Sequence, residues 1–394
     1  MSSMLKTTVS REAIHKRFSK NAVTFLKETL KLVQKACLDC QISLSLSQSF
    51  TKILLCDSTW WKLHQSLKKD FPGFGGSSSE AHGKLQLVYD FMAGQIEAFK
   101  VTAGTENDTV YLSKLLKIVP KGALLIVDLG YFSLEFFSKL CAKGAYFISR
   151  LKSTVKVFDP ANETEINLLK VLSKSKEKYT EITVTVGVRR RLLTPCRLIA
   201  IRVPKEVGNQ RRKEYLMKNR RSKKITKLSL KLCDWIIMIT NAPNEKIDPE
   251  KVLDLYKIRW QIELIFKQLK STIGIENICC SNKHRMLCEV YGKLIITIII
   301  TKLYGYLNCR LWNCEKKELS LEKCFKRFQE RMFVLVNMLI NDFKEAQMYY
   351  IELIKTISKT CIKLKQKSRS SSLQKLCSSS SLHFERVSGD FCYA

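Results

Sequence analysis

The sequence predicts an α/β fold in which helices flank a mixed sheet, with an inserted β-rich subdomain and a helical C-terminal region. Three observations support this prediction. Between residues 52 and 150 the apolar patterns indicate three strands, a helix, a strand, a helix and a strand, and a hairpin group followed by crossover units is typical of a mixed sheet. Residues 151–234 contain β-rich segments among many Lys and Arg. After about residue 275, apolar residues recur at helical spacing to about residue 364.

These patterns divide the chain into six segments. They are a basic helical N-terminal segment (1–50), the first part of the α/β core (51–150), a β-rich basic insertion (151–234), the rest of the core (235–300), a helical C-terminal region (301–364) and a tail (365–394). The N-terminal segment has a helical pattern that breaks near Ser19–Asn21. The tail is rich in Ser and Lys, which predicts disorder.

Two short apolar strands in the core each end on an acid. Residues 53–56 lead to Asp57, and residues 123–127 lead to Asp128. Between them, residues 84–91 and 95–102 predict a hairpin and residues 108–119 a helix. An acid that closes an apolar strand is expected at the edge of the sheet.

Further elements follow Asp128 in order. Residues 132–141 predict a helix, and residues 145–149 a strand that ends at Arg150. In the insertion, residues 181–188 and 196–203 predict strands, and residues 205–231 a basic arm. Residues 235–240 return to the apolar strand pattern, starting at Trp235.

The stretch Tyr256–Lys270 (YKIRWQIELIFKQLK) predicts one amphipathic helix. At about 100° per residue, Tyr256, Arg259, Glu263 and Lys270 fall within an arc of about 60°. The opposite side is apolar and suits a core-facing helix; it comprises Ile258, Ile262, Ile265, Phe266 and Leu269. The helix therefore has one buried face and one face that presents an acid among cations and an aromatic.

The chain carries 68 Lys plus Arg against 36 Asp plus Glu, a net charge of +32. Such a field attracts polyanions, so nucleic acid is the first partner to consider and an anionic membrane surface the alternative. The apolar run 294–301 is far shorter than the about 20 residues that span a bilayer, and we interpret it as a buried helix. The N-terminus lacks the apolar core of a secretory signal, which predicts a cytoplasmic protein.

The 15 cysteines are scattered without a disulfide framework, which predicts reduced thiols. Two groups also suggest zinc: the pair Cys37 and Cys40, and the set Cys279, Cys280, His284 and Cys288. The first pair lies in a helical pattern and the second set lacks a paired CxxC, so zinc is the weaker interpretation.

Asp57, Asp128 and Glu263 are the three candidate catalytic carboxylates. Their oxygens suit Mg²⁺ or Mn²⁺, and two such ions could activate an attacking oxygen and stabilise a leaving one in a displacement at phosphorus. Each residue also has an ordinary structural interpretation, because an Asp that closes a strand is commonly a turn residue or helix cap. A helical Glu beside Arg and Lys commonly forms surface ion pairs.

The signature in this stretch and four motifs that precede it resemble one known family. The spacing of Tyr256, Arg259, Glu263 and Lys270 is the YREK signature, and it follows DST around Asp57, VDLGYF around Asp128, YFISRLK through Arg150 and TNAP after Trp235. The chain resembles insertion-sequence transposases of the DDE type, in the IS-four family, over roughly residues 10–300. The resemblance implies a ribonuclease H-like catalytic core with a β-rich insertion between the second Asp and the Glu.

The resemblance also implies an activity and its site. Asp57, Asp128 and Glu263 would bind two divalent metal ions for cleavage and strand transfer in a cut-and-paste reaction. Tyr256, Arg259 and Lys270 would contact phosphates near the cleaved end, and Arg150 is a further DNA-binding candidate. Trp235 is a candidate for stacking on a flipped base, with packing at the start of its strand as the alternative.

The implied partners are double-stranded DNA, as terminal inverted repeats and as target, and a second copy of the chain when assembled on DNA. Such a protein would work in the bacterial cytoplasm, associated with the nucleoid. Members of the family usually carry an N-terminal helical end-binding domain, and only 56 residues precede Asp57, so a shortened chain is expected here. Two alternatives stay open: an inactive DNA-binding remnant, and a ribonuclease H-like nuclease without strand transfer.

Overall fold

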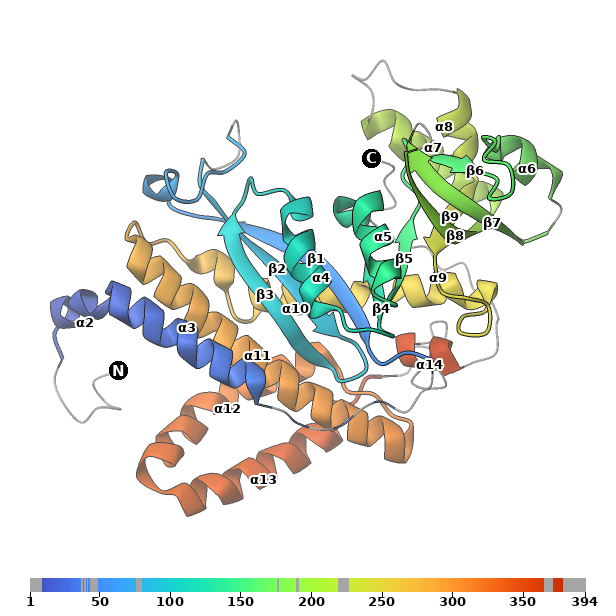
Figure 1. The fold of residues 1–394 in the computed structure, drawn as a ribbon. Helices are drawn as coiled ribbons and strands as arrows, with labels where there is room; N and C mark the ends of the chain where they lie inside the picture. Colours follow the sequence, from blue (N-terminus) through green and yellow to red (C-terminus); the bar gives the residue numbers. More distant parts are fainter. Residues whose placement is uncertain are drawn as a thin grey trace. The chain divides into compact units, whose positions relative to one another are not determined.

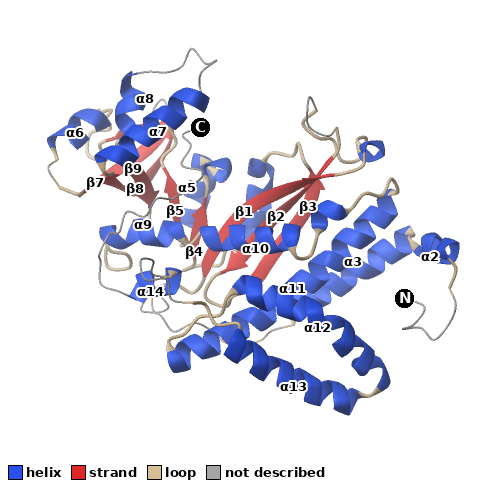
Figure 2. Ribbon diagram, turned by 180° about the vertical axis from the view of Figure 1, so that it is seen from behind, coloured by secondary structure: helices blue, strands red, loops and turns tan. Residues whose placement is uncertain are grey.

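The computed structural model describes residues 9–36, 38, 40, 42, 49–75, 80–175, 177–188, 191–218, 227–364 and 371–377 (Figures 1 and 2). The chain forms two compact units. Unit 1 comprises Met1–Ser43, Asp57–Asn107 and Trp260–Leu364, and unit 2 comprises Leu44–Cys56, Asp108–Arg259 and Lys365–Ala394. Strand β1 (Ile53–Lys62) contributes residues to both units.

In unit 1, the strand order is β3-β2-β1. Strands β2 (His82–Asp90) and β3 (Gln95–Ala103) form the predicted antiparallel hairpin. Strand β1 continues six residues beyond the predicted end at Cys56, so Asp57 lies within the strand and the prediction of an acid at its end is wrong. The reason lies in the residues Ser58–Lys62, where buried and exposed side chains alternate as in a strand with one covered face.

The helices of unit 1 come from both ends of the chain. They are α2 (Arg11–Arg17), α3 (Lys20–Lys35), α10 (Trp260–Ser271), α11 (Lys283–Glu315), α12 (Leu321–Asn341) and α13 (Phe343–Thr360). The side chain of Ser19 caps α3, which confirms the predicted helix break at this position. Helices α3 and α11 pack side by side, and Lys302 of α11 donates to the carbonyls of Gln34 and Ala36 at the C-terminal end of α3 (Figure 1). Helices α11, α12 and α13 confirm the predicted helical C-terminal region.

The apolar run 294–301 lies inside α11, where Leu294, Ile298 and Ile300 are buried. This confirms the interpretation as a buried helix. In the part of the chain that the structure describes, we find no helix with the length and apolar character that a membrane crossing requires.

A close backbone contact joins α11 to the β2–β3 turn. A Cβ atom added at Gly305 would meet the carbonyl oxygen of Gly94 and would lie 2.8 Å from that of Ala93. Gly94 itself has a φ of 65°, a conformation that glycine adopts without strain. A side chain at position 305 therefore has no space between the helix and the turn.

We expect Gly305→Ala to lower the free energy of unfolding by about 1–3 kcal/mol, because overpacking at a close contact forces the backbones apart. Gly292→Ala in the same helix is the matched control, since an added Cβ there meets nothing within 4 Å. That change should raise the free energy of unfolding by about 0.5–1 kcal/mol through helix propensity alone. Urea unfolding of both variants checks the pair, and equal effects would contradict the contact.

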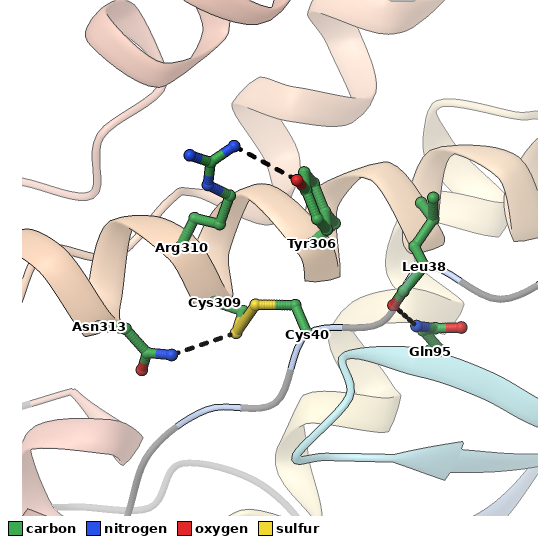
Figure 3. Close-up of a disulfide and its surroundings, with 7 residues drawn as sticks. All are labelled: Leu38, Cys40, Gln95, Tyr306, Cys309, Arg310 and Asn313. Atoms are coloured by element: carbon green, nitrogen blue, oxygen red, sulfur yellow. Dashed lines mark hydrogen bonds between the residues drawn. A yellow bond between two sulfur atoms is a disulfide. The ribbon is translucent and has the colours of Figure 1, made fainter.

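A disulfide joins Cys40 to Cys309 of α11 within unit 1 (Figure 3). The Gln95 side chain donates to the carbonyl of Leu38 close to Cys40, and the Asn313 amide lies 3.6 Å from the Cys309 sulfur. The prediction of reduced thiols is wrong for this pair, because packing of the segment after α3 against α11 brings together two residues 269 positions apart. Cys37 lies outside the described residues, and Cys40 is engaged in the disulfide.

Unit 2 contains a mixed sheet with the order β1-β4-β5-β9-β8-β7-β6. Its further strands are β4 (Leu124–Val127), β5 (Tyr146–Arg150), β6 (Lys156–Phe158), β7 (Tyr179–Val188), β8 (Arg191–Arg202) and β9 (Trp235–Thr240). Strands β1, β4 and β5 are parallel, and β9, β8, β7 and β6 pair antiparallel. This confirms the predicted mixed sheet. Along the chain, the antiparallel hairpin β2–β3 precedes the parallel strands β4 and β5, which is the order expected of the ribonuclease H-like core that the resemblance implies.

The strands of the insertion belong to this same sheet. Strand β8 pairs with β9, and β9 pairs with β5, so the strands of the predicted β-rich insertion extend the core sheet. Backbone pairing explains this, because β9 leaves a free edge that β8 completes. The basic arm contains helices α7 (Lys205–Lys218) and α8 (Lys227–Leu232).

The remaining helices of unit 2 are α4 (Leu112–Ile118), α5 (Leu134–Ala142), α6 (Leu168–Lys174), α9 (Pro249–Lys257) and α14 (Ser372–Cys377). The helix predicted for residues 108–119 is confirmed as a 3-10 turn followed by α4. Helix α14 corrects the prediction of a tail without structure, because Leu373 and Leu376 are buried and hold this turn in place. Residues 365–370 and 378–394 of the tail lie outside the described residues.

Candidate active site

Asp128 lies at the end of β4, as predicted. All four residues of β4 are buried, and the carboxyl ends of parallel strands β4 and β5 meet at one edge of the sheet. Asp128 precedes the 3-10 turn Leu129–Tyr131 but makes no side-chain cap hydrogen bond to it. Its carboxylate is 33% exposed and is directed to other partners.

Two side chains bind the same oxygen of Asp128. Arg150, the last residue of β5, donates from Nη2 to Oδ1 at 2.8 Å. The Tyr256 hydroxyl donates to Oδ1 at 3.1 Å. The guanidinium of Arg259 lies 6.0 Å from the centre of the Tyr256 ring. Unit 2 therefore gathers Asp128, Arg150, Tyr256 and Arg259, four of the predicted site residues.

The charges around Asp128 keep it ionised. Burial opposes its ionisation, but the guanidinium groups of Arg150 and Arg259 outweigh burial and lower the pKa of Asp128 below its ordinary value. Burial, aided by the Asp128 charge, raises the pKa of Tyr256 to about 12, so its hydroxyl remains a donor at neutral pH. The site thus presents an ionised carboxylate to which Arg150 and Tyr256 both donate at Oδ1.

The predicted single helix over Tyr256–Lys270 is wrong in one respect, because it is broken at Ile258 and Arg259. Helix α9 ends at Lys257 and α10 begins at Trp260. The amides of Ile258 and Arg259 donate to carbonyls three residues earlier, which tightens the chain into a turn. This turn lets Tyr256 lie buried against Asp128, while the apolar side predicted for the stretch is confirmed as buried.

Unit 1 carries the other two acids. Asp57 is half-buried on β1, and its Oδ1 accepts the Ser58 amide at 2.8 Å. Glu263 is half-buried in the first turn of α10. Lys270, in the last turn of α10, pairs with Glu276 at 2.9 Å and has its ammonium 5.7 Å from the centre of the Trp60 ring.

Trp235 lies at the start of β9 and is 5% exposed. The guanidinium of Arg202 lies over its ring at 5.5 Å, and Arg211 donates to its carbonyl at 3.0 Å. This placement corresponds to the packing alternative, since a buried ring beneath an arginine offers no open face to a base.

Carboxylate oxygens are the ligands that a hard divalent ion prefers, and each of the three acids is a partly exposed residue. Asp57 and Glu263 belong to unit 1 and Asp128 to unit 2. Within the described ranges, no group of three or more His, Cys, Asp or Glu side chains forms a metal-binding cluster, and this includes Cys279, Cys280, His284 and Cys288.

Two features of the site region escaped the sequence patterns. The TNAP segment is structural: the Asn241 side chain accepts from the Phe147 amide and donates to the Ala145 carbonyl, which holds it on β5. Trp60 is exposed next to Lys270. The sequence carried a signal for it, because two adjacent tryptophans in a strand must point to opposite faces.

Comparisons with known proteins identify the family. The family described as "Transposase DDE domain" matches residues 48–299. The transposase of insertion sequence element IS231F from Bacillus thuringiensis subsp. israelensis is 32% identical over 355 residues, 85% of this chain and 74% of that protein. The IS231B transposase from subsp. berliner is 30% identical over 90% of this chain and 78% of that protein.

The transposase of IS1151 from Clostridium perfringens is 28% identical over 80% of this chain and 70% of that protein. A cryo-EM structure of a piggyBac transposase synaptic complex with hairpin DNA is similar with a TM-score of 0.43 and 12% identity, covering 82% of this chain and 61% of that chain. The chain therefore belongs to the insertion-sequence transposases with a DDE domain, in the IS-four family that its YREK signature indicates.

Proposed function

We propose that this chain catalyses metal-dependent cleavage and strand transfer at the ends of an insertion sequence, in a cut-and-paste reaction. The observation that carries the proposal is the environment of Asp128. Arg150, Tyr256 and Arg259 surround this acid and keep it ionised, and two of them are the Tyr and Arg of the YREK signature. A structural acid that only closed a strand would have no need of two guanidinium groups.

The proposed catalytic acids are Asp57, Asp128 and Glu263, which together would hold two Mg²⁺ or Mn²⁺ ions. Bound ions of this kind supply activation of the attacking oxygen and stabilisation of the leaving one at phosphorus. Arg150 and Tyr256 hold the Asp128 carboxylate in one orientation by occupying a single oxygen. The acid therefore reaches the reaction already charged and oriented.

The proposed DNA contacts are cationic or donate hydrogen bonds. Arg259 and Lys270 would bind phosphates, and Arg150 and Tyr256 would meet the DNA next to the acid they orient. For Trp235, stacking on a flipped base would require its ring to leave Arg202, so we assign it the last place among these contacts. The net charge of +32 supports double-stranded DNA as the partner, both as terminal inverted repeats and as target. Because a cut-and-paste reaction must hold two element ends at once, we propose that the chain assembles on DNA as a homodimer.

A cleavage and joining assay with the native element ends tests the proposal. We expect Mg²⁺-dependent nicking of the labelled end and transfer to a target plasmid, both abolished by EDTA. Cleavage without joining would indicate a nuclease with no strand-transfer role. Salt-sensitive binding without cleavage would indicate a DNA-binding remnant and contradict the proposed activity.

A further inference from the structure

Unit 1 carries a cluster of aromatic side chains that are exposed to solvent. Trp60 of β1 is 43% exposed and Phe74 is 61% exposed, and their ring centres lie 6.1 Å apart at an angle of 72°. Beneath them lies His82 of β2, fully buried, with its ring 4.9 Å from Trp60 and 5.5 Å from Phe74. The cluster therefore presents two exposed aromatic side chains next to a buried histidine.

The strands that carry this cluster are closely packed. His82 packs against Gly104 so closely that an added Cβ at Gly104 would meet the His82 side chain. On the other face of β1, Trp61 is buried, and an added Cβ at Gly83 would lie 2.5 Å from its ring. Because these contacts on both faces fix β1 and β2, the Trp60 side chain is held in place although it is partly exposed. Rings that are fixed in advance lose little conformational entropy when they bind a ligand.

Positive charge borders the aromatic faces. The Lys270 ammonium lies 5.7 Å from the centre of the Trp60 ring and is held there by Glu276 at 2.9 Å. Lys62 follows Trp60 by two residues, on the same exposed face of β1. Burial, together with the Lys62 charge, lowers the pKa of His82, so the His82 imidazole stays neutral at pH 7. Aromatic faces beside cations are the features that bind unpaired nucleotides.

We propose that Trp60 and Phe74 form a stacking platform for an unpaired nucleobase, with Lys270 binding the adjoining phosphate. The inference rests on the proposed function, since it takes DNA as the substrate. A paired base hides its face in the duplex, whereas an unpaired one can stack on a ring. Trp60 lies about 10 Å along β1 from Asp57 and points to the opposite face of the strand. The platform therefore holds a base that has left the duplex and does not take part in the cleavage chemistry.

Fluorescence anisotropy with two DNA probes tests the platform. One is a fully paired element end, and the other has the same sequence with three unpaired bases at its terminus; Ca²⁺ replaces Mg²⁺ to suppress cleavage. We expect Trp60→Ala to weaken binding of the unpaired probe about 5- to 150-fold, the range for one lost base stack. Binding of the paired probe should change less than twofold. Trp60→Phe, which keeps an aromatic face, should retain most of the affinity for the unpaired probe.

Phe333→Ala is the matched control, because Phe333 is an aromatic residue of unit 1 that is 58% exposed and lies on α12. It should leave both affinities unchanged. Equal affinity of the wild-type chain for the two probes would overturn the platform, as would equal losses of both probes in Trp60→Ala. A change in oligomeric state of the DNA-free Trp60→Ala variant would instead assign the cluster to a contact between copies.

The two proposals fail in different ways. The platform is read from binding without cleavage, whereas the proposed function is read from cleavage and joining. A chain that prefers the unpaired probe through Trp60 but never cuts an end would keep the platform and contradict the transposase activity.

Discussion

Replacing Asp128 with asparagine is expected to slow end cleavage by about 100- to 1000-fold or more, the scale of losing one preorganised electrostatic group. Asparagine keeps the shape of the side chain but removes the charge that Arg150, Tyr256 and Arg259 are arranged around. A hard divalent ion would lose a charged ligand in the same step. Single-turnover cleavage of a labelled element end in Mg²⁺ measures the effect.

The matched control is Asp254→Asn. Asp254 also lies in unit 2 and also pairs with a cation, Lys257, at 2.9 Å, but it is no part of the proposed site. This variant should cleave at nearly the wild-type rate. Asp128→Asn leaves Arg150 without its counter-charge, so Asp128→Glu is needed as a second variant that keeps the charge and moves it by one methylene. Low activity in Asp128→Glu, with normal urea unfolding, would show that position matters as well as charge.

The pH dependence of cleavage by the wild-type chain tests whether ionisation of Asp128 limits activity. The pKa of Asp128 lies below its ordinary value, so this acid remains ionised as pH falls from 8 to 6. A loss of activity over that interval would therefore have to come from another group. If cleavage of Asp128→Asn matched the wild-type rate at every pH, Asp128 would not be a catalytic acid.

The elements that the sequence predicted well are those with a strong local signal. Strand β4 is a short, fully apolar run that Asp128 follows, and β5 starts with apolar residues and ends at Arg150, both as predicted. The buried face of α10 follows from its spacing of apolar residues. Such patterns depend on neighbours along the chain, so the sequence alone contains them.

The elements that escaped prediction depend on contacts between distant residues. The helix break at Ile258 and Arg259 has neither Pro nor Gly to mark it, and it accompanies burial of Tyr256 against Asp128, 128 positions earlier. The strands of the insertion join the core sheet through backbone pairing, which leaves no residue pattern. The orientation of Asp128 by Arg150 also joins two strands. Composition and periodicity do not predict contacts between residues that are far apart in the sequence.

Reduction of the Cys40–Cys309 disulfide is expected to lower the free energy of unfolding by about 2–5 kcal/mol. The two residues are 269 positions apart, and closing so long a loop restricts the unfolded chain strongly in the chain-entropy model. Cys40 follows α3, and Cys309 is buried in α11, so the bond ties the N-terminal helices to the C-terminal ones within unit 1. Urea unfolding with and without a reductant measures the difference.

The variants Cys40→Ser and Cys314→Ser distinguish the effect of the disulfide on stability from any effect of the free cysteines. Cys314 is an exposed free cysteine on the same helix, so its replacement should leave both the stability and the reductant effect unchanged. Cys40→Ser should have the stability of the reduced wild-type chain and no further response to the reductant. A full response in Cys40→Ser would mean that other cysteines carry it. Because Lys302 also joins α11 to the end of α3, hydrogen exchange in α3 should rise on reduction without reaching the unfolded rate.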